Sequence, residues 1–451
     1  MHWLKWMALV TALLIWLKHG GYSDWVPVLL FTMLGWIASD FRRVDSAPRW
    51  IDRVFPFAPT LLWLLFIGSD RLRYVTPPGS DWPIRLLGLL ALGASVIVGR
   101  ELRAKREAPG RMAWNTVIAA LVLGAIIAWV PSLSPDPFID VFRSNRLALE
   151  HFLSGRNVYA EAYPDIYGGR YDYAPGFLYW PGTLLALVPG HALLGDLRYS
   201  LGACLAITVA AVAWFLRGER RIAPDSYLWT MYWLAIPIVP FVIEQAWIDP
   251  ILAAQSVVAL LAARRGNWLI SAMATGFMLA TKQYGFLLPL FLLPFLWREW
   301  GVRRAAIWTV VSGAVFLAIL IPFVLPDPQA FWNMTVSGHA SAGVRLDALN
   351  FTALLARLSG FKLPGSVQAL ASVAGIAIGL NGVLRAKRGE WHRVPWAMAQ
   401  AFIVSFLFGK FAFGNYYFLS LTWVALGAIL HAQERITQEA AATEALAPLR
   451  G

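Results

Sequence analysis

The chain has 451 residues, of which 58% are hydrophobic and 14% are charged, and its formal net charge is +12. Soluble globular domains contain about 45–50% apolar and about 25% charged residues, so this composition excludes a soluble fold. The arginines and lysines lie in short loops between apolar runs, where they orient a membrane protein and attract anionic lipid. Nucleic-acid binding is therefore not expected.

Apolar runs of roughly 17–22 residues recur along the chain, and each is long enough to cross a hydrocarbon core about 30 Å thick. The run at 6–17 has the length of a signal peptide, but no cleavage site follows it, so we expect it to remain as the first helix. Basic loops near 42–53 and 100–111 predict a cytoplasmic N-terminus. The first five spans are expected at about 6–18, 24–40, 54–68, 83–99 and 114–130.

The segment 131–197 contains no clear crossing and is rich in aspartate and tyrosine. Residues 141–153 predict a short amphipathic helix on the membrane surface. Residues 176–194 are apolar enough to span, but Pro181 and Pro189 interrupt them. A crossing there would also move a basic loop to the outer side, so we expect a re-entrant or juxtamembrane segment.

Nine further spans complete an all-α polytopic fold of about 14 transmembrane helices. They are expected at about 198–216, 225–243, 249–264, 268–281, 284–298, 303–325, 366–384, 394–409 and 414–431. We divide the chain into a four-span N-terminal extension (1–113), a catalytic transmembrane region (114–431) and a frayed cytoplasmic tail (432–451). No internal repeat is evident, which disfavours transporters built from inverted repeats.

This threading places several ionisable and aromatic residues at the outer ends of spans. They are Asp136, Asp140, Glu244, Asp249, Lys282, His339, Arg345 and Lys410, with Tyr416 and Tyr417 close to the last of them. Ionisable groups at membrane depth are costly and tend to mark function. A carboxylate can act as a general base on a hydroxyl, and cations can stabilise a phosphate leaving group.

Four motifs in this part of the chain resemble those of GT-C glycosyltransferases, and most closely the type that depends on polyprenyl-phosphate mannose. They are Ser134-Pro-Asp-Pro-Phe-Ile-Asp140 with Gly155-Arg-Asn-Val-Tyr159, Tyr171-Asp-Tyr-Ala-Pro175, Gly276-Phe-Met-Leu-Ala-Thr-Lys282, and Lys410-Phe-Ala-Phe-Gly-Asn415-Tyr416-Tyr417. The resemblance covers about 131–430 and leaves the first four spans without a counterpart.

The resemblance implies a GT-C-like fold in the cell membrane with its active site on the extracytoplasmic face. It implies an inverting transfer from a polyprenyl-phosphate sugar to a glycan or glycolipid acceptor, with no cofactor and no required metal ion. Asp140 would be the catalytic base, with Asp136 as the second candidate. The donor phosphate would meet Lys282, Arg345 and Lys410, and the substrates would meet Glu244, Asp249, Tyr171, Tyr173, His339, Tyr416 and Tyr417.

Structural roles compete with each of these assignments. Asp140 could be a helix N-cap, Asp136 a turn residue, and Lys282 a side chain that snorkels to the interface. The tyrosines could form an interfacial aromatic belt. Two other functions also stay open. A lipid-linked-glycan ligase or polymerase would use arginine and histidine in the large loop, and a lipid or glycolipid transporter would need ionisable residues deep within its spans.

Overall fold

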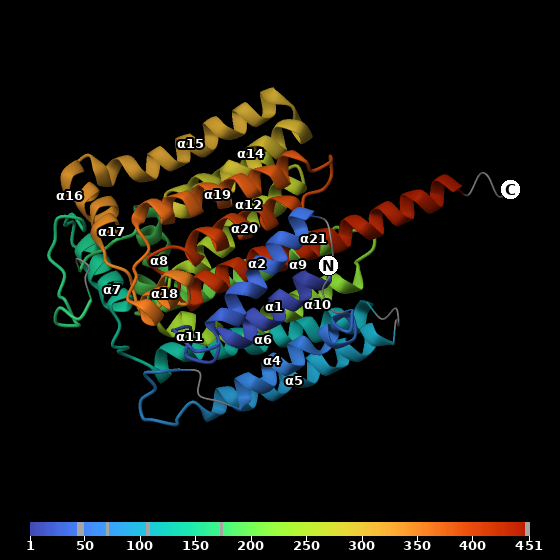
Figure 1. Cartoon of the computed structure of the whole chain (residues 1–451), viewed down its shortest axis with the longest axis horizontal. Helices are drawn as coiled ribbons and strands as arrows, with labels where there is room; N and C mark the ends of the chain where they lie inside the picture. The colour runs from blue at the N-terminus through green and yellow to red at the C-terminus, as the bar shows by residue number, and fades with distance from the viewer. Residues whose placement is uncertain (43–48, 69–71, 105–108, 172–174, 447–451) are drawn as a thin grey trace.

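The computed structural model describes residues 1–42, 49–68, 72–104, 109–171 and 175–446, and within these ranges the chain forms helices and no strand. Most of the long helices lie side by side along the long axis of the molecule (Figure 1). The prediction of an all-helical fold is confirmed for the described residues.

The first third of the chain contains α1 (His2–Leu14), α2 (Val26–Arg42), α3 (Ile51–Val54), η1 (Phe55–Phe57), α4 (Ala58–Ile67), α5 (Trp82–Arg103), α6 (Pro109–Leu133) and α7 (Asp140–Leu153). The middle contains α8 (Pro181–Leu194), α9 (Arg198–Arg217), α10 (Pro224–Leu234), α11 (Val239–Glu244), α12 (Asp249–Arg264), α13 (Trp268–Leu279), η2 (Gln283–Phe286) and α14 (Leu287–Trp300). The last third contains α15 (Val302–Val324), α16 (Pro328–Trp332), η3 (Asn333–Ser337), α17 (Gly338–Ser341), α18 (Phe351–Ser359), α19 (Gly365–Leu384), α20 (Arg393–Leu407) and α21 (Gly414–Leu446).

Among the described residues, five helices are long and apolar enough to cross a membrane: α5, α6, α9, α15 and α19. In α15, the most apolar 18-residue window has a mean hydropathy of 2.4, yet only 11% of it is buried. An apolar helix this exposed is expected to face lipid. These helices indicate a membrane protein, and the number of fourteen crossings stays a prediction.

Two expected elements differ from the structure. The span predicted at 225–243 is two helices, α10 and α11, because Pro237 lies between them and its ring lacks an amide hydrogen and clashes with the preceding turn. The tail predicted to fray after 431 instead continues α21 to Leu446. Its run of alanine and glutamate has high helix propensity, which explains the extension.

Buried polar side chains join the helices of the core. Tyr232 of α10 donates a hydrogen bond to the carbonyl of Ala8 in α1 (2.6 Å), and Trp423 of α21 donates to the hydroxyl of Ser256 in α12 (2.9 Å). Both rings are fully buried. Because a buried donor without a partner is costly, these bonds favour one arrangement of the helices.

Loops from distant parts of the sequence meet at one end of the bundle, which we call the site end. The elements α7, α8, α16, α17 and α18 lie there (Figure 1). The backbone amide of Tyr22 donates to the carbonyl of Asp347 (2.9 Å), and the amide of Arg345 donates to the carbonyl of Lys410 (3.2 Å). These bonds connect the N-terminal region to the last loops of the chain.

Candidate functional site

Asp140 is the first residue of α7, at the site end. Its Oδ1 accepts a hydrogen bond from the amide of Val141 (2.9 Å) and lies 3.5 Å from the hydroxyl of Tyr167. The N-cap of α7 is Ile139, so the interpretation of Asp140 as the N-cap is wrong. The carboxylate lies in the first helical turn, where the exposed amide groups stabilise a negative charge. It is half-buried, with part of its surface accessible.

Aromatic rings and a cation surround this carboxylate. The ring of Tyr171 packs edge-on against Tyr167, with centroids 5.0 Å apart, and the Arg345 guanidinium lies 3.8 Å from the Tyr171 centroid. Burial opposes the charge of Arg345, but its hydrogen bonds with Asp347, together with the charge of Asp140, raise the pKa of Arg345 overall. Burial and then the charge of Asp140 raise the pKa of Tyr167. Asp140, Tyr171 and Arg345 therefore act on one another electrostatically.

A buried ion pair forms the second part of the site. The Lys282 ammonium lies 3.5 Å from Oδ1 of Asp249, and both side chains are buried. Asp249 also accepts hydrogen bonds from the hydroxyl of Tyr284 and from Nδ2 of Asn415 (2.6 Å). A buried charge requires a partner and further hydrogen bonds, and Asp249 has both.

Three tyrosine rings surround the Lys282 ammonium. Their centroids lie 4.5 Å away for Tyr284, 5.4 Å for Tyr179 and 5.5 Å for Tyr416. Cations within about 6 Å of an aromatic centroid are attracted by the ring quadrupole. We call this set, with Asp249 and Asn415, the lysine cluster.

Tyr179 is held beside Lys282 by backbone contacts between two distant segments. The amide of Trp180 donates to the carbonyl of Thr281 (3.3 Å), and the amide of Gly182 donates to the carbonyl of Ala280 (2.7 Å). A Cβ atom on Gly182 would lie only 2.7 Å from the Ala280 oxygen. Glycine therefore allows the start of α8 to approach the end of α13.

Tyr179 also connects the lysine cluster with Asp140. Burial raises the pKa of the Tyr179 phenol, and the charges of Asp249 and Asp140 raise it further. Contacts also lead from Arg345 to the lysine cluster: its guanidinium lies 5.1 Å from the ring centroid of Phe413, whose carbonyl accepts a hydrogen bond from the amide of Tyr416 (3.0 Å).

The remaining predicted acids have mainly structural contacts. Asp136 is exposed and pairs with Arg143 (3.2 Å) and Arg146 (3.6 Å). Glu244 is fully buried, and its carboxylate accepts hydrogen bonds from the amides of Arg73 (2.8 Å) and Tyr74 (2.7 Å). Glu244 thus anchors a loop of the N-terminal region.

The other predicted residues of the last loops are also placed by specific contacts. The Lys410 ammonium donates to the carbonyl of Ala340 (2.6 Å), and the buried hydroxyl of Tyr417 donates to the carbonyl of Leu349. Tyr416 belongs to the lysine cluster. Tyr173 lies outside the described residues, and so does the side chain of His339, whose backbone is part of α17.

Sequence reasoning did not single out Tyr179, Tyr284 or Asn415 as site residues. Tyr284 lies two residues after the motif that ends at Lys282, and Asn415 lies within the last motif, directly before Tyr416. Tyr179 could not be found from spacing, because its position depends on the contact between α8 and α13. Oδ1 of Asn415 is buried and accepts no hydrogen bond from the described residues, so it is an acceptor available within the lysine cluster.

No curated protein and no solved structure matches the chain. Residues 177–390 match the model of Glycosyltransferase family 87. The matched segment includes Asp249, Lys282 and Arg345, whereas Asp140 and Tyr416 lie on either side of it. This match, in a helical membrane protein with a cation and carboxylates gathered at one end, indicates a glycosyltransferase.

Proposed function

We propose that the protein is an inverting glycosyltransferase. It moves a sugar from a polyprenyl-phosphate sugar to a glycan or glycolipid acceptor at the extracytoplasmic face of the membrane. The observation that supports this proposal most strongly is the series of contacts at the site end that leads from Asp140 through Tyr167, Tyr171 and Arg345 to Phe413 and the lysine cluster. A transferase of this type needs a base for the acceptor and a cation for the phosphate, and both are present at the site end.

In this mechanism Asp140 accepts the proton of the acceptor hydroxyl. The hydroxyl oxygen attacks the anomeric carbon of the sugar from the side opposite the phosphate, so the configuration inverts. The bond between the anomeric carbon and the phosphate oxygen breaks, and its electron pair leaves with the polyprenyl phosphate. The balanced step needs no metal ion or redox cofactor.

Lys282 neutralises the departing phosphate. Its ammonium already has Asp249 as a partner at 3.5 Å, and three aromatic rings exclude water from it. Arg345 and Lys410 give a second pair of cations, and they are held by Asp347 and by the carbonyl of Ala340. Donor binding exchanges part of these contacts for the phosphate oxygens.

The sugar hydroxyls bind between the aromatic rings and the free acceptor of Asn415. Tyr171 and Tyr416 offer ring faces for the sugar, and Oδ1 of Asn415 can accept one hydroxyl hydrogen. Glu244 acts through the loop that it anchors, because the amides of Arg73 and Tyr74 occupy its carboxylate.

The direct test is to incubate the purified protein, reconstituted in lipid, with a panel of polyprenyl-phosphate sugars and glycolipid acceptors. Mass spectrometry then follows the release of polyprenyl phosphate and the mass gain of the acceptor. We expect both products from at least one donor. Movement of intact donor lipid across the bilayer without product would instead support the transporter, and joining of whole lipid-linked glycans would support the ligase.

A further inference from the structure

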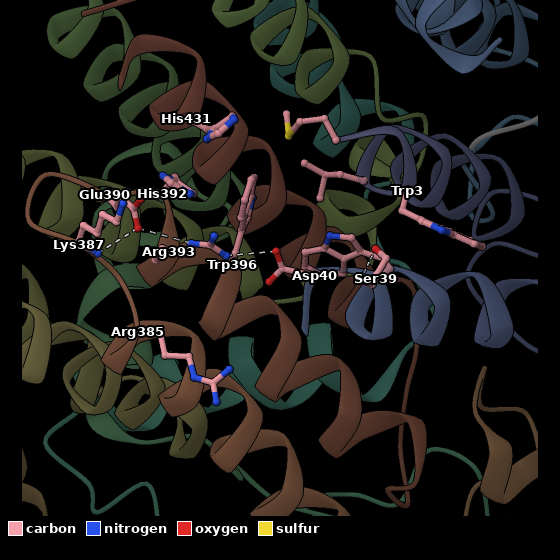
Figure 2. Close-up of a pocket in the computed structure, with 13 residues that line it drawn as sticks. Trp3, Ser39, Asp40, Arg385, Lys387, Glu390, His392, Arg393, Trp396 and His431 are labelled. Carbon is pink, nitrogen blue, oxygen red and sulfur yellow. Dashed lines mark hydrogen bonds and ion pairs between the residues drawn. The ribbon is translucent and has the colours of Figure 1, made fainter. Parts of the chain in front are cut away.

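A cluster of two histidines and a glutamate lies away from the candidate site. His392 precedes α20, whereas His431 and Glu434 are one turn apart on α21. One potential ligand atom of each residue lies within 4.8 Å of those of the other two. Nδ1 of His392 contacts the Glu434 carboxylate, which also accepts a hydrogen bond from the His392 amide (3.1 Å). Figure 2 shows both imidazole rings on neighbouring elements beside the same cavity.

The cavity has a volume of about 380 Å³ and is open to solvent. Both histidines line it, together with Trp3, Asp40 and Trp396. Helix α2 begins at Val26, shortly after Tyr22, whose amide is hydrogen-bonded to Asp347 in the loop that carries Arg345. Asp40 lies near the other end of α2. The cavity therefore lies at the end of the bundle opposite the site end.

His431 is held in place by rings rather than by hydrogen bonds. Its ring centroid lies 4.6 Å from that of His392 and 5.6 Å from that of Trp396. Within the described part of the chain, its imidazole makes no hydrogen bond, and it is only partly exposed. A half-buried imidazole that faces a second imidazole and a carboxylate has a nitrogen available as a metal ligand.

We propose that His392, His431 and Glu434 bind one Zn²⁺ ion. Two imidazoles and one carboxylate leave a fourth, tetrahedral position for a water molecule from the cavity. Imidazole nitrogen suits Zn²⁺ and related transition metals, whereas Mg²⁺ and Ca²⁺ prefer sites made of oxygen alone. Zinc bonds of about 2.0–2.2 Å place the ligand atoms about 3.4 Å apart, so the ion would replace the direct contact between His392 and Glu434, and small rotations of the three side chains would bring their ligand atoms to this spacing.

The ion would join the start of α20 to α21 at the end of the bundle that carries no part of the proposed transferase chemistry. The other end of α21 reaches the site end, where it carries Asn415 and Tyr416. Zinc binding is independent of the proposed function, because none of its ligands contacts the lysine cluster or Asp140 among the contacts of the described residues.

The test uses full-length protein without a polyhistidine tag, treated with a chelator and then titrated with Co²⁺ and Zn²⁺. We expect one Co²⁺ per chain, with the visible absorption bands of a tetrahedral site, and displacement of Co²⁺ by one Zn²⁺. His431→Ala should weaken Zn²⁺ binding by at least about 100-fold, since loss of even an outer-shell partner weakens metal affinity by 10–100-fold. His191→Ala in α8, another partly exposed histidine, is the matched control and should bind like the wild type.

His392 and Glu434 are buried, so their substitution risks the fold, and His431→Ala is the decisive variant. Glu434→Gln keeps the shape of the side chain and should also weaken Zn²⁺ binding, with a circular-dichroism spectrum like that of the wild type. Wild-type protein that binds neither ion at micromolar concentration would overturn the proposal. So would a His431→Ala variant with wild-type affinity, which would leave the cluster as a hydrogen-bonded contact between helices.

Discussion

Asp140 and Asp249 are both the first residue of a helix, but their surroundings prepare them for different roles. Asp249 is fully buried and bound by Lys282, Tyr284 and Asn415. Asp140 is half-buried, with Tyr167 beside it. A carboxylate that is fully buried cannot meet a substrate, whereas one that keeps accessible surface at the start of a helix can. This contrast favours Asp140 as the base and Asp249 as the residue that positions Lys282.

The role of the ion pair between Lys282 and Asp249 can be tested by replacing both residues with uncharged ones. Lys282→Met alone leaves Asp249 buried without its cation, which typically costs about 3–5 kcal/mol of folding free energy. The double variant Lys282→Met with Asp249→Asn removes both charges and should fold. We expect it to bind the polyprenyl-phosphate donor at least about tenfold more weakly, equivalent to about 1.4 kcal/mol.

Donor affinity and thermal unfolding are both measured for this double variant, with Asp249→Asn alone as the comparison. A double variant that is stable and binds the donor with wild-type affinity would show that Lys282 has a structural role only.

Tyr416 and Tyr417 are adjacent in the chain but have different surroundings: Tyr416 lies beside Lys282, whereas Tyr417 is bonded to the backbone. Substitution of Tyr417 is therefore expected to change stability rather than activity. The Tyr417 hydroxyl is buried and donates to the Leu349 carbonyl. Tyr417→Phe should lower the free energy of unfolding by about 0.5–1.5 kcal/mol, because one buried hydrogen bond is lost. Activity per folded molecule should stay at the wild-type level, as judged by thermal unfolding alongside turnover. A selective loss of turnover would place Tyr417 in the substrate site.

At the scale of elements, the sequence predicted what depends on local pattern. The helix predicted at 141–153 is present as α7, which is one residue longer. It could be predicted because its apolar spacing lies within fourteen consecutive residues. The candidate site residues at span ends, including Asp140 and Lys282, were predicted from their position next to apolar runs, and their roles stay predictions. The break at Pro237 and the continuation of α21 were missed, although both follow from ordinary proline and alanine propensities.

Contacts between elements far apart in the chain could not be predicted from the sequence. The pairing of Trp180 with Thr281 depends on how α8 meets α13, and it decides that Tyr179 rather than another tyrosine lies beside Lys282. Periodicity specifies which face of a helix is buried but not which neighbour covers it. The candidate site was therefore predicted as a set of span ends, whereas the position of Tyr179 beside Lys282 was not predicted.

Gly182 gives a test of this connection. Gly182→Ala places a methyl group 2.7 Å from the Ala280 oxygen, which is backbone and cannot move aside easily. Overpacking of this kind costs about 1–3 kcal/mol and should displace the start of α8 from α13. We expect a clear loss of donor affinity, because Tyr179 moves away from Lys282.

Ala186→Val, in the same helix at a half-buried position, is the matched control for added volume. Equal donor affinities for the wild type, Gly182→Ala and Ala186→Val would mean that the contact between α8 and α13 does not position the donor site.

For the whole molecule, the N-terminal region takes part in building the site end. Tyr22 is bonded to Asp347, the amides of Arg73 and Tyr74 hold Glu244, and the Tyr74 hydroxyl donates to the carbonyl of Phe138 (2.8 Å), two residues before Asp140. The N-terminal region therefore supports the loops around Asp140, although the family match covers only residues 177–390. The sequence alone predicted no role for the first helices.

The proposed orientation is tested by labelling single cysteines in whole cells. Cys204 is replaced by serine, and cysteines are introduced at three exposed positions: Ala162 and Ser341 at the site end, and Arg388 in a basic loop. A membrane-impermeant maleimide added from outside should label the first two and leave the third unlabelled, because basic loops stay in the cytoplasm. Labelling of Arg388→Cys alone would show that the protein has the opposite orientation in the membrane.

Whether Asp140 is the general base of a sugar transfer is tested by the turnover of Asp140→Asn with a donor that the wild-type protein uses. Asparagine keeps the size of the side chain but cannot accept the proton at working pH. We predict that turnover falls by at least about 100-fold, since general-base assistance contributes about 10²–10⁴ in rate, while the melting temperature changes little. Asp136→Asn, measured in parallel, should retain turnover, because Asp136 is exposed and paired with arginines. Near wild-type turnover by Asp140→Asn would show that Asp140 is not the base of the transfer.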